Sequence, residues 1–515
     1  MLRIGIDVGG TNTDAVLMSN TEVVDWVKAA TTRDVMSGIT AALSGLLDKT
    51  HVDTQSISGV MIGTTHFTNA VVQRRDLMQT AIVRLGLPAT AALPPMTDWP
   101  EDLRDTIGNH AYLAHGGNEF DGRLIAPVDE AELKGIAADI RAKGIRSVAV
   151  SAVFSPVKGD VERQAAEILR KELPAAYITI SSEIGRMGLI ERENAAIMNA
   201  CLQDLGKKTC SAFRDALKQS KIAAPLYLTQ NDGTLMSAEH AERFPVLTFS
   251  SGPTNSMRGA AFLSGIKDGL VVDVGGTTTD VGALTHGFPR EASVAVQVGG
   301  VRTNFRMPDV YSIGLGGGSH VQRDPIKVGP RSVGYELTTR ALIFGGTDLT
   351  SSDIAVAAGL ANFGDRSKVA GLDPVFVQAV VTRMQVIIAE AVDRMKTSVS
   401  AVPVIAVGGG SMLIADQIEG TSQIVKPAHY SVANAVGAAI AQISGETDRV
   451  FALSEMSRDQ AVQIAKDEAI DRAVGAGADR DTVQVVDVED VPLAYVPGNA
   501  TRIRVKAVGD LKIRG

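Results

Sequence analysis

The chain carries Asp7-Val8-Gly9-Gly10-Thr11-Asn12-Thr13-Asp14 near its start and Asp273-Val274-Gly275-Gly276-Thr277-Thr278-Thr279-Asp280 past its middle, and seven of the eight positions are identical. Each copy lies between two short apolar runs, so the pattern predicts a strand, a tight Gly-Gly turn and a second strand, formed twice. Paired glycines allow positive φ angles and leave no Cβ between the backbone and a ligand. The repeat therefore predicts two matched hairpins.

These turns have the chemistry of a phosphate site. The N–H groups of a Gly-Gly turn form an anion-binding concavity, and threonine hydroxyls add donors. Asp7 and Asp273 end the first strand of each hairpin, where a carboxylate is placed to hold a magnesium ion. Gly-rich hairpins are common singly, whereas two near-identical copies favour a shared ligand. Two such hairpins facing each other would hold a nucleoside triphosphate from both sides.

Composition limits the classes of protein that fit. At 515 residues, with 45% hydrophobic and 21% charged residues, the chain suits two to four globular domains. The net charge is −8 and there is no Lys/Arg block, so we expect no nucleic-acid partner. Asp7 interrupts the first apolar segment and no apolar run approaches about 18 residues, so we expect no signal peptide, no membrane span and a cytoplasmic location. The two cysteines, Cys201 and Cys210, fit buried thiols in a reducing compartment.

Alternating strand and helix patterns predict an α/β protein in three parts. Residues 1–190 form a first lobe with an inserted α/β segment at about 88–185. Residues 191–445 form a second lobe with hinge helices, beginning with one long helix over 191–220. Residues 446–515 form a small C-terminal α+β module.

Three further segments accompany the hairpins. Two are rich in small residues at helical spacing, 194–200 and 433–439, and we expect these helices to cross closely at a hinge between the lobes. The third is Gly408-Gly409-Gly410-Ser411, which follows an apolar strand. The order hairpin, small helix, hairpin, Gly-rich turn, small helix resembles that of the sugar kinase, heat-shock chaperone and actin superfamily. The resemblance implies an α/β fold with a two-lobed actin-like ATPase core of duplicated ribonuclease-H-like halves, a small α+β insertion and a C-terminal α+β tail.

Other nucleotide motifs fail. There is no G-x-x-x-x-G-K-[ST], which excludes a P-loop, and Gly314–Ser319 does not match G-x-G-x-x-G. The superfamily resemblance instead implies that Asp7 and Asp273 hold magnesium through water, with ATP as the nucleotide. The residues implied to contact the phosphates are Gly9, Gly10, Thr11, Asn12, Thr13, Gly275, Gly276, Thr277, Thr278 and Thr279. Gly408, Gly409 and Gly410 would border the adenosine. The catalytic residues in this interpretation are Asp7, Asp273, Thr11 and Thr277. Asp14 and Asp280 either touch magnesium or cap their turns.

A narrower resemblance covers most of the chain. Gly63-Thr64-Thr65, Glu191-Arg192, Ser251-Gly252-Pro253, Gly316-Gly317-Gly318-Ser319 and Val328-Gly329-Pro330 resemble, in order, the A-type subunit of the ATP-dependent hydantoinase/5-oxoprolinase family. Members use ATP to phosphorylate a carbonyl oxygen in cyclic amides or imides, or in ketone carboxylation, commonly with a B-type partner subunit. After Gly334 the family usually has Pro-Gly-Pro-Ala-Cys-Tyr-Gly, and Tyr335–Ala341 stand there instead.

The acceptor side is less defined. Arg302 and Arg306 lie four residues apart and are suited to bind a carboxylate together, and we expect them to line the substrate side of the cleft with Gly316, Gly317, Gly318 and Ser319. Further candidates for the pocket or a base are Glu183, Glu191, Asp309, His66 and His320. Each also has a structural explanation, as a helix-start, loop or surface residue.

Four functions remain open. The leading one is an ATP-dependent hydrolase of a cyclic amide or imide, such as a hydantoin or a 5-oxoproline-like compound, or the A-type subunit of such an enzyme. The others are the ATPase subunit of a ketone carboxylase, a non-catalytic nucleotide switch acting on a partner, and a sugar kinase. The sequence is compatible with a B-type partner and with a homo-oligomer. Two cysteines are too few for a zinc-binding sugar kinase or an iron–sulfur dehydratase activator.

Overall fold

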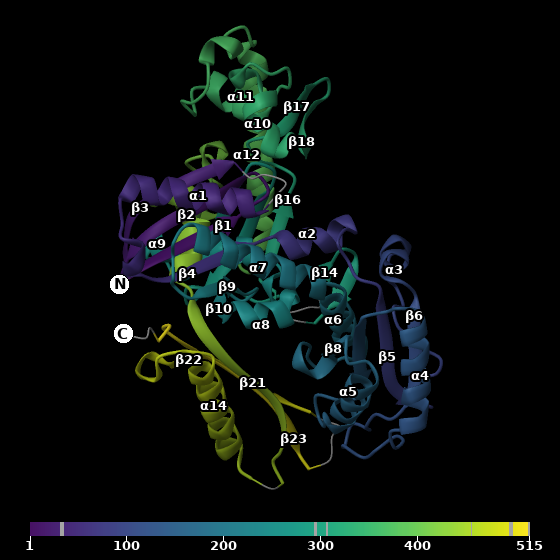
Figure 1. Cartoon of the computed structure of the whole chain (residues 1–515). Coiled ribbons are helices and arrows are strands. Elements are labelled where there is room, and N and C mark those ends of the chain that lie inside the picture. Colours follow the sequence, from purple (N-terminus) through teal and green to yellow (C-terminus); the bar gives the residue numbers. More distant parts are fainter. Residues whose placement is uncertain (31–34, 293–295, 305–306, 455, 494–497, 513–515) are drawn as a thin grey trace.

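The computed structural model describes residues 1–30, 35–292, 296–304, 307–454, 456–493 and 498–512. Two large sheets form two lobes, a smaller sheet forms an inserted unit beside the first lobe, and the C-terminal strands lie below it (Figure 1). The second lobe carries an outlying subdomain, labelled α10, α11, β17 and β18 in the figure. The two-lobed α/β architecture expected from the sequence is therefore present.

The first lobe is built on a nine-stranded sheet in the order β22-β23-β21-β10-β9-β4-β1-β2-β3. Strands β1 to β3 form an antiparallel meander, β4 runs parallel to β1, and β9 runs parallel to β4. The bounds are β1 (Leu2–Val8), β2 (Asn12–Ser19), β3 (Glu22–Ala30), β4 (Ile57–Thr64), β9 (Leu226–Thr229), β10 (Thr234–Ser237), β21 (Gln442–Ala452), β22 (Gln484–Pro492) and β23 (Ala500–Gly509).

The second lobe repeats the first-lobe pattern in a six-stranded sheet. Its order is β13-β12-β11-β19-β20, with β16 also paired to β12. Strands β11 and β12 are antiparallel, β19 runs parallel to β11, and β20 runs parallel to β19. The bounds are β11 (Gly269–Val274), β12 (Thr279–Thr285), β13 (Phe288–Pro289), β16 (Val310–Ile313), β19 (Val402–Val407) and β20 (Thr421–Val425). The shared order places the two Gly-Gly turns at equivalent corners of the two sheets.

The inserted unit is a parallel four-stranded sheet in the order β6-β5-β7-β8. It begins earlier than the expected residue 88, because β5 at Thr80–Leu87 belongs to it. The other strands are β6 (His110–His115), β7 (Ser147–Ala152) and β8 (Tyr177–Ile180). Its helices are α3 (Glu101–Ile107), α4 (Glu130–Ala142) and α5 (Asp160–Glu172).

Two small two-stranded sheets lie outside the inserted unit. One joins β14 (Val296–Val298) to β15 (Val301–Thr303), and the other joins β17 (Ser319–Arg323) to β18 (Ile326–Ser332).

The remaining α-helices are distributed over the two lobes, the edge of the inserted unit and the outlying subdomain. Their bounds are α1 (Val35–Thr50), α2 (His66–Gln73), α6 (Leu189–Cys201), α7 (Gln203–Gln219), α8 (Ala238–Arg243), α9 (Ser251–Ser264), α10 (Leu337–Arg340), α11 (Ser351–Ala357), α12 (Pro374–Met395), α13 (Ala433–Ala439) and α14 (Arg458–Gly475). The single helix expected over 191–220 was wrong. Two helices meet at Leu202, whose N–H bonds back three residues to Asn199 rather than four and so ends α6.

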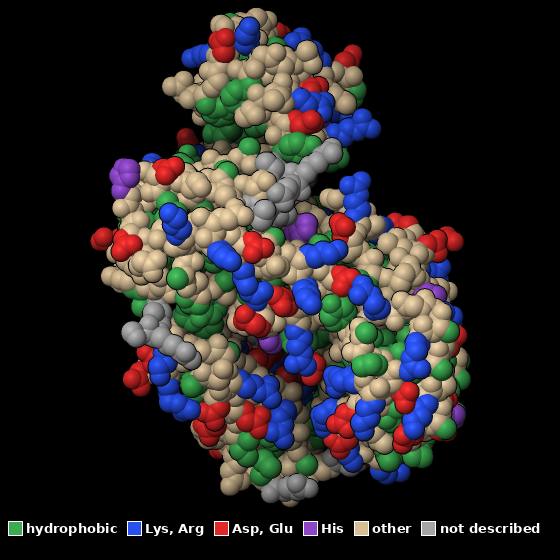
Figure 2. Space-filling view, in the orientation of Figure 1, with side chains coloured by type: hydrophobic (Ala, Val, Ile, Leu, Met, Phe, Trp, Pro, Cys, Tyr) green, Lys and Arg blue, Asp and Glu red, His purple; other side chains and the backbone are tan. Residues whose placement is uncertain are grey.

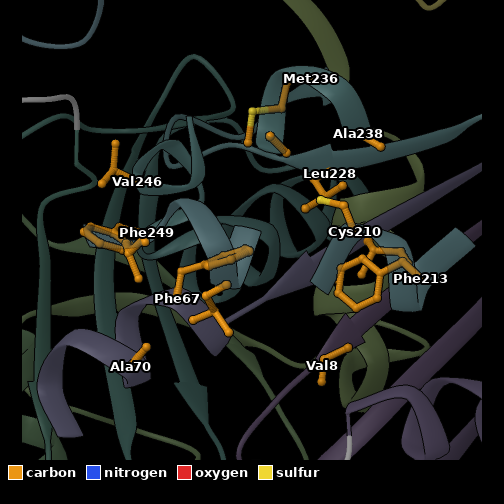
Figure 3. Close-up of a cluster of buried hydrophobic side chains, with 14 of the residues drawn as sticks. Val8, Phe67, Ala70, Cys210, Phe213, Leu228, Met236, Ala238, Val246 and Phe249 are labelled. Atoms are coloured by element: carbon orange, nitrogen blue, oxygen red, sulfur yellow. The ribbon is translucent and has the colours of Figure 1, made fainter. Parts of the chain in front are cut away.

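The core of the first lobe joins residues that are distant in sequence. Figure 3 shows Phe67, Phe213 and Phe249 packed with Leu228 and Met236 beneath the first sheet. Both cysteines are free and buried, as expected, and burial raises the pKa of each thiol to about 12.

The lobes meet where α9 crosses α13. A Cβ on Gly259 would lie 1.8 Å from the Ala433 carbonyl oxygen, and one on Gly437 would lie 1.9 Å from the Asn255 carbonyl oxygen. A close crossing of small-residue helices is present, but the partner of α13 is α9. The expectation that 194–200 would be this partner was wrong, because α6 packs against β7 and β15 instead.

The chain crosses between lobes more often than the expected limits imply. Strands β9 and β10, assigned by sequence to the second lobe, pair within the first sheet. The strand that leads into the segment beyond residue 445, β21, pairs with β10 through Gln442 and Ile443, and β23 pairs with β21, so the C-terminal strands continue the first sheet. A β-sheet recruits strands through backbone hydrogen bonds irrespective of chain distance.

Among the described helices, α12 is long and apolar enough to cross a membrane by length and composition. The sequence expectation concerned uninterrupted apolar runs, and charged residues such as Arg383 and Glu390 interrupt this helix. One such helix is weak evidence, because Val380, Met384 and Ile388 are buried in the core of the second lobe, as in any core helix.

Candidate functional site

Both Gly-Gly turns open onto one cavity of about 660 Å³ between the lobes, hereafter the hairpin cleft. The first hairpin contributes Asp7, Gly9, Gly10, Thr11 and Asn12, and the second contributes Asp273, Gly275, Gly276, Thr277 and Thr278. Thr13 and Thr279 are fully buried behind the turns and do not line the cleft. The structure thus brings together most of the predicted phosphate residues.

The two hairpins have the same local geometry. Asp7 pairs across the strands with Asp14, and Asp273 pairs with Asp280. The Gly9 N–H donates to the Asn12 carbonyl oxygen over 3.0 Å, and the Gly275 N–H donates to that of Thr278 over 2.9 Å. None of the four turn glycines is among the residues with positive φ, so the expected conformational reason for glycine was wrong there. Close approach explains Gly276, where an added Cβ would lie 2.6 Å from Thr11 Oγ1.

A network of amides supports the acidic groups of the first hairpin. Asn434 Nδ2 on α13 donates to Asp7 Oδ2 and to Asp14 Oδ2, each over 3.0 Å. Asn255 Nδ2 on α9 donates to Asp7 Oδ1 over 3.3 Å. Lys28 Nζ lies 2.7 Å from Asp14 Oδ1. The junction helices of the lobes therefore position the carboxylates directly.

The cleft carboxyl groups have unusual electrostatics. The pKa of Asp7 is raised to about 6, first because burial removes water and then because Asp14 lies nearby, while hydrogen bonds from Asn255 and Asn434 oppose the rise. Burial likewise raises the pKa of Asp273, against a hydrogen bond from Ser256. The pKa of Asp280 is raised to about 6, chiefly by burial. Buried carboxyl groups of this kind are suited to a cation that offsets their charge.

Asp14 and Asp280 do not cap their turns. Asp14 accepts from Lys28 and Asn434, and Asp280 accepts from Ser312 on β16. Of the two roles left open by the sequence, the turn cap is therefore wrong. Both carboxyl groups line the hairpin cleft.

The far wall of the cleft contains Gly408, Gly409 and Gly410, as expected. Gly408 has a φ of +86°, and a Cβ there would lie 2.2 Å from Asp273 Oδ1, so only glycine fits beside this carboxylate. The Gly410 N–H donates to the Val274 carbonyl oxygen over 2.8 Å. The segment thus holds the end of β11 as well as bordering the cavity.

An aromatic wall, made of Tyr335, Phe344 and Phe363, was not predicted. All three residues line the hairpin cleft, and the rings of Phe344 and Phe363 are stacked with centroids 6.3 Å apart. Their exposed fractions are 48%, 37% and 37%. The one available signal was Tyr335, which lies where the sequence departs from the usual stretch after Gly334.

Family models match two regions of this chain. Hydantoinase/oxoprolinase N-terminal region matches residues 3–173, and Hydantoinase/oxoprolinase matches residues 192–365. The chain belongs to the hydantoinase/oxoprolinase family. The first region includes the first hairpin and the inserted unit up to its last strand, β8, and the second includes the second hairpin and α9.

Curated relatives of this family member are similar at about one quarter identity. The acetophenone carboxylase gamma subunit of Aromatoleum aromaticum is 25% identical over 70% of this chain and 53% of its own length. The caprolactamase subunit alpha of Pseudomonas jessenii is 25% identical over 69% of this chain and 54% of its own. The 5-oxoprolinase of Saccharomyces cerevisiae is 24% identical over 68% and 31%. The chain spans about half the length of the first two relatives and about a third of the third.

Two solved structures share the fold of this family member over nearly its whole length. The nucleotide-free acetone carboxylase matches with a TM-score of 0.72 at 17% identity, and the ATP-dependent caprolactamase from Pseudomonas jessenii matches with a TM-score of 0.78 at 18% identity. Each match covers 99% of this chain and 88% of the other. The α/β actin-like ATPase fold expected from the sequence is confirmed.

The Gly-rich segment 316–319, which was expected to line the substrate side of the cleft, lies mostly behind the second turn. The Gly317 N–H donates to the Gly275 carbonyl oxygen over 3.0 Å and the Gly318 N–H to that of Gly276 over 2.7 Å, so this segment supports the second turn from behind. Gly316, Gly318 and Ser319 are buried away from the cleft, and only Gly317 lines it. Packing of one loop on another, which the sequence does not reveal, explains these glycines.

The arginines expected beside that segment lie elsewhere or outside the described residues. Arg302 is on β15, where its guanidinium lies 3.1 Å from Glu191 and its side chain is 60% exposed. It does not line the hairpin cleft in the described part of the chain. Arg306 falls outside the described residues.

The other candidate residues also have structural partners. Glu183 pairs with Arg243, Asp309 pairs with Arg290, and His320 Nδ1 lies 4.0 Å from Asp348. His66 begins α2, and burial lowers its pKa. None of these lines the hairpin cleft, whereas Lys28, Asn69, Ser256 and Asn434 are among the residues that line it without having been predicted.

Proposed function

We propose that the protein binds ATP in the hairpin cleft. The observation that carries this proposal is that two near-identical turns from opposite lobes face one cavity, with the buried Asp7 beside one and the half-buried Asp273 beside the other. Turn N–H groups and the hydroxyls of Thr11 and Thr277 suit the phosphates. The stacked Phe344 and Phe363 suit the base, because aromatic rings stack favourably on one another.

Magnesium fits this site through water. The described residues contain no group of three or more His, Cys, Asp or Glu placed to hold a metal directly. Asp7 and Asp273 nevertheless line one cavity from opposite lobes with raised pKa values. These carboxylates would hold the hydrated ion, which when bound neutralises charge on the phosphates. Lys28 would remain paired with Asp14.

The reaction that fits is activation of a carbonyl oxygen. In this proposal the oxygen of a cyclic amide or imide forms a bond to the terminal phosphorus of ATP, and the bond to ADP breaks. Water then adds to the activated carbon and the ring C–N bond breaks, which leaves a free amine and an acyl phosphate. A second water adds to the acyl phosphate, so that phosphate leaves and a carboxylate remains. The chain's own contribution is to position the phosphates and offset their charge, which is the main catalytic requirement of phosphoryl transfer. Family membership and the relatives named caprolactamase and 5-oxoprolinase support this proposal.

We also infer that the chain works as one subunit of a larger enzyme. Two relatives are named as a gamma and an alpha subunit, and each is about twice as long as the segment that matches. A B-type partner would then supply the remainder of the acceptor site. This inference agrees with the position of Arg302, which pairs with Glu191 and does not line the cleft as described.

A second candidate is the ATPase subunit of a ketone carboxylase. It is favoured by the acetophenone carboxylase relative and by the fold match to acetone carboxylase. A non-catalytic nucleotide switch is the third candidate. It predicts slow ATP hydrolysis that no amide or ketone stimulates.

Two measurements test the proposal. Calorimetry with a non-hydrolysable ATP analogue should show magnesium-dependent binding that Asp7→Asn or Asp273→Asn weakens, while Asp25→Asn, on the far strand β3, leaves it unchanged. ATP hydrolysis should then be measured with hydantoins, 5-oxoproline, lactams and ketones, with and without a B-type subunit. Stimulation by a cyclic amide supports the hydrolase, and stimulation by a ketone with bicarbonate supports the carboxylase. Equal magnesium-dependent binding in both aspartate variants would contradict the assignment of the cleft.

A further inference from the structure

A second cavity lies at the seam between the inserted unit, the first sheet and the C-terminal elements. This seam cavity measures about 900 Å³ and is lined by the turn before α5, the segment 182–187, the β9–β10 turn, β21 and the end of α14. Figure 2 shows Lys/Arg and Asp/Glu side chains mixed on both sides of this seam. It shares no lining residue with the hairpin cleft.

Two buried polar side chains line the seam cavity without a partner. Ser155 and Asn231 are 2% and 3% exposed, and Ser155 Oγ and Asn231 Nδ2 have no hydrogen-bond partner among the described residues. An unpaired buried donor costs free energy, and native proteins pair nearly all such groups. Two of them on one cavity indicate a ligand with oxygen acceptors.

The first turn of α5 adds an anion-binding feature at the same cavity. Gly159 caps this 13-residue helix without a side-chain hydrogen bond. A Cβ on Gly159 would lie 2.8 Å from Arg163 Nη1, so the guanidinium lies over the helix start. Arg163 pairs with Asp160 and is 61% exposed. Helix N-terminal N–H groups and an arginine together favour an anion.

The charges on the cavity walls select the kind of anion. The four acidic lining residues are already neutralised by neighbours: Glu183 by Arg243, Asp232 by Lys506, Asp448 by Arg502 and Glu446 by Arg504. Because they are paired, these acidic residues attract a cationic ligand only weakly. Their remaining negative charge repels a doubly charged phosphate more than a singly charged carboxylate. We propose that the seam cavity binds a small molecule that carries a carboxylate.

Helix α9 connects this site to the hairpin cleft. Thr254 Oγ1 donates to the carbonyl oxygen of Asn231 over 3.0 Å. The next residue, Asn255, donates to Thr229 Oγ1 over 3.0 Å and to Asp7. Gly252 and Ser256, on the same helix, line the hairpin cleft. A ligand that fixes Asn231 therefore acts on the helix that positions Asp7, and occupancy of the seam cavity regulates the nucleotide site.

Binding is tested by calorimetry on the full chain without nucleotide. The probes are the monocarboxylate butyrate, its neutral isostere butyramide, and inorganic phosphate. We expect butyrate to bind at least about tenfold more tightly than butyramide and phosphate. Ser155→Ala and Arg163→Ala should each weaken binding about tenfold. Arg123→Ala is the matched control, because Arg123 is also an exposed arginine of the inserted unit, paired with Asp121.

Stability separates a ligand role from a structural one. Ser155→Ala removes an unpaired buried hydroxyl, so the melting temperature should stay the same or rise while carboxylate affinity falls. A lower melting temperature would show that the hydroxyl stabilises the fold, and would overturn its assignment to a ligand. The proposal also fails if no carboxylate binds at millimolar concentration, if phosphate binds more tightly, or if both variants bind as the unmodified chain does.

The inference that occupancy of the seam cavity regulates the nucleotide site rests on the proposed function. The affinity for an ATP analogue should change at least about threefold when the bound carboxylate is saturating, and carboxylate affinity should change equally on nucleotide binding. Thr254→Val removes the hydroxyl bonded to Asn231. In this variant both ligands should still bind, but neither should change the affinity for the other. Equal ATP affinity with and without carboxylate would refute the regulation. If no ATP analogue binds, the proposed function fails, while the carboxylate measurement stands by itself.

Discussion

Gly276 lies against Thr11 across the hairpin cleft, so the turn of one lobe touches the turn of the other. A Cβ on Gly276 would be 2.6 Å from Thr11 Oγ1 and 3.0 Å from its Cγ2. Gly10, the equivalent residue of the first turn, has no heavy atom within 4 Å of its added Cβ. The two turns share the same Gly-Gly sequence, but close packing requires glycine at position 276 and does not require it at position 10.

Gly276→Ala should therefore separate the two turns. The added methyl group must displace Thr11, so we expect affinity for an ATP analogue to fall about tenfold or more. Gly10→Ala places its methyl group in open space and should have the smaller effect. Calorimetry on both variants checks the difference. Equal losses would show that the turns separate freely.

The raised pKa of Asp7 predicts a pH-dependent gain in stability for Asp7→Asn. A carboxyl group with a pKa of about 6 when folded and 3.8 as its ordinary value takes up protons on folding, so the free energy of unfolding falls as pH rises through this window. Asparagine does not titrate, so the Asp7→Asn variant does not lose this free energy of unfolding as the pH rises. Without nucleotide or magnesium, Asp7→Asn should be more stable than the unmodified chain by about 1–3 kcal/mol near pH 8, with the difference vanishing near pH 4.

Urea unfolding across this pH range measures the effect. Asp25→Asn is the control, because the pKa of Asp25 is lowered by a hydrogen bond from Lys49. It should show no gain at high pH. A difference between Asp7→Asn and the unmodified chain that does not change with pH would contradict the raised pKa of Asp7.

The crossing of α9 and α13 should not tolerate a methyl group. A Cβ on Gly437 would lie 1.9 Å from the Asn255 carbonyl oxygen, which is backbone and cannot rotate away. We expect Gly437→Ala to lower the free energy of unfolding by about 1–3 kcal/mol. Gly135→Ala, in the exposed face of α4 with nothing within 4 Å, should raise it by about 0.5–1 kcal/mol. Opposite signs in urea unfolding are the expected result, and a neutral Gly437→Ala would show that the helices are not locked together.

The aromatic wall should recognise the base rather than the phosphates. Phe344→Ala should weaken ATP-analogue binding about tenfold, since an aromatic contact contributes about 0.5–1.5 kcal/mol beyond its buried area. Tripolyphosphate, which lacks a base, should bind the variant and the unmodified chain alike. Phe120→Ala, an equally exposed phenylalanine of the inserted unit, is the control. Equal losses for ATP and tripolyphosphate would remove the wall from the base site.

A buried ion pair holds the inserted unit to α6. Arg84 Nε on β5 donates to Glu193 over 2.7 Å, and both side chains are at most 1% exposed. Glu193→Gln leaves a buried guanidinium without its counter-charge and should destabilise the protein by about 3–5 kcal/mol. Replacing both residues, as Arg84→Met with Glu193→Leu, should recover much of that loss. Urea unfolding measures the free energy of unfolding of both variants. A double variant that is less stable than Glu193→Gln would contradict this account.

Local pattern was sufficient for several elements. The residues around 147–154 have the alternation of a strand and those over 374–397 have helical periodicity, and β7 and α12 form there. The twin octapeptides predicted both hairpins, because turn chemistry and strand alternation are properties of adjacent residues. The helix over 191–220 failed because a single break at Leu202 leaves the apolar pattern intact on both sides.

The acceptor side shows where such reasoning stops. Arg302 and the 316–319 segment are rich in suitable chemistry, yet one forms a surface ion pair with Glu191 and the other lies behind the second turn. Conversely, Lys28 lines the cleft without any local motif, and Asn434 lines it from a segment that the sequence singled out only for its small residues. Residue type suggests what a side chain can bind, but only its neighbours in space decide whether that capacity is already used.

The sequence by itself determined the two hairpins, the two-lobed α/β class and the position of the acidic groups at the strand ends, because these depend on spacing along the chain. The tertiary structure alone decided that α13 crosses α9 and that the C-terminal strands complete the first sheet. It alone placed Asn434 between Asp7 and Asp14 and opened the seam cavity. These features depend on backbone approach and on the pairing of buried polar groups between segments hundreds of residues apart, for which no local pattern exists.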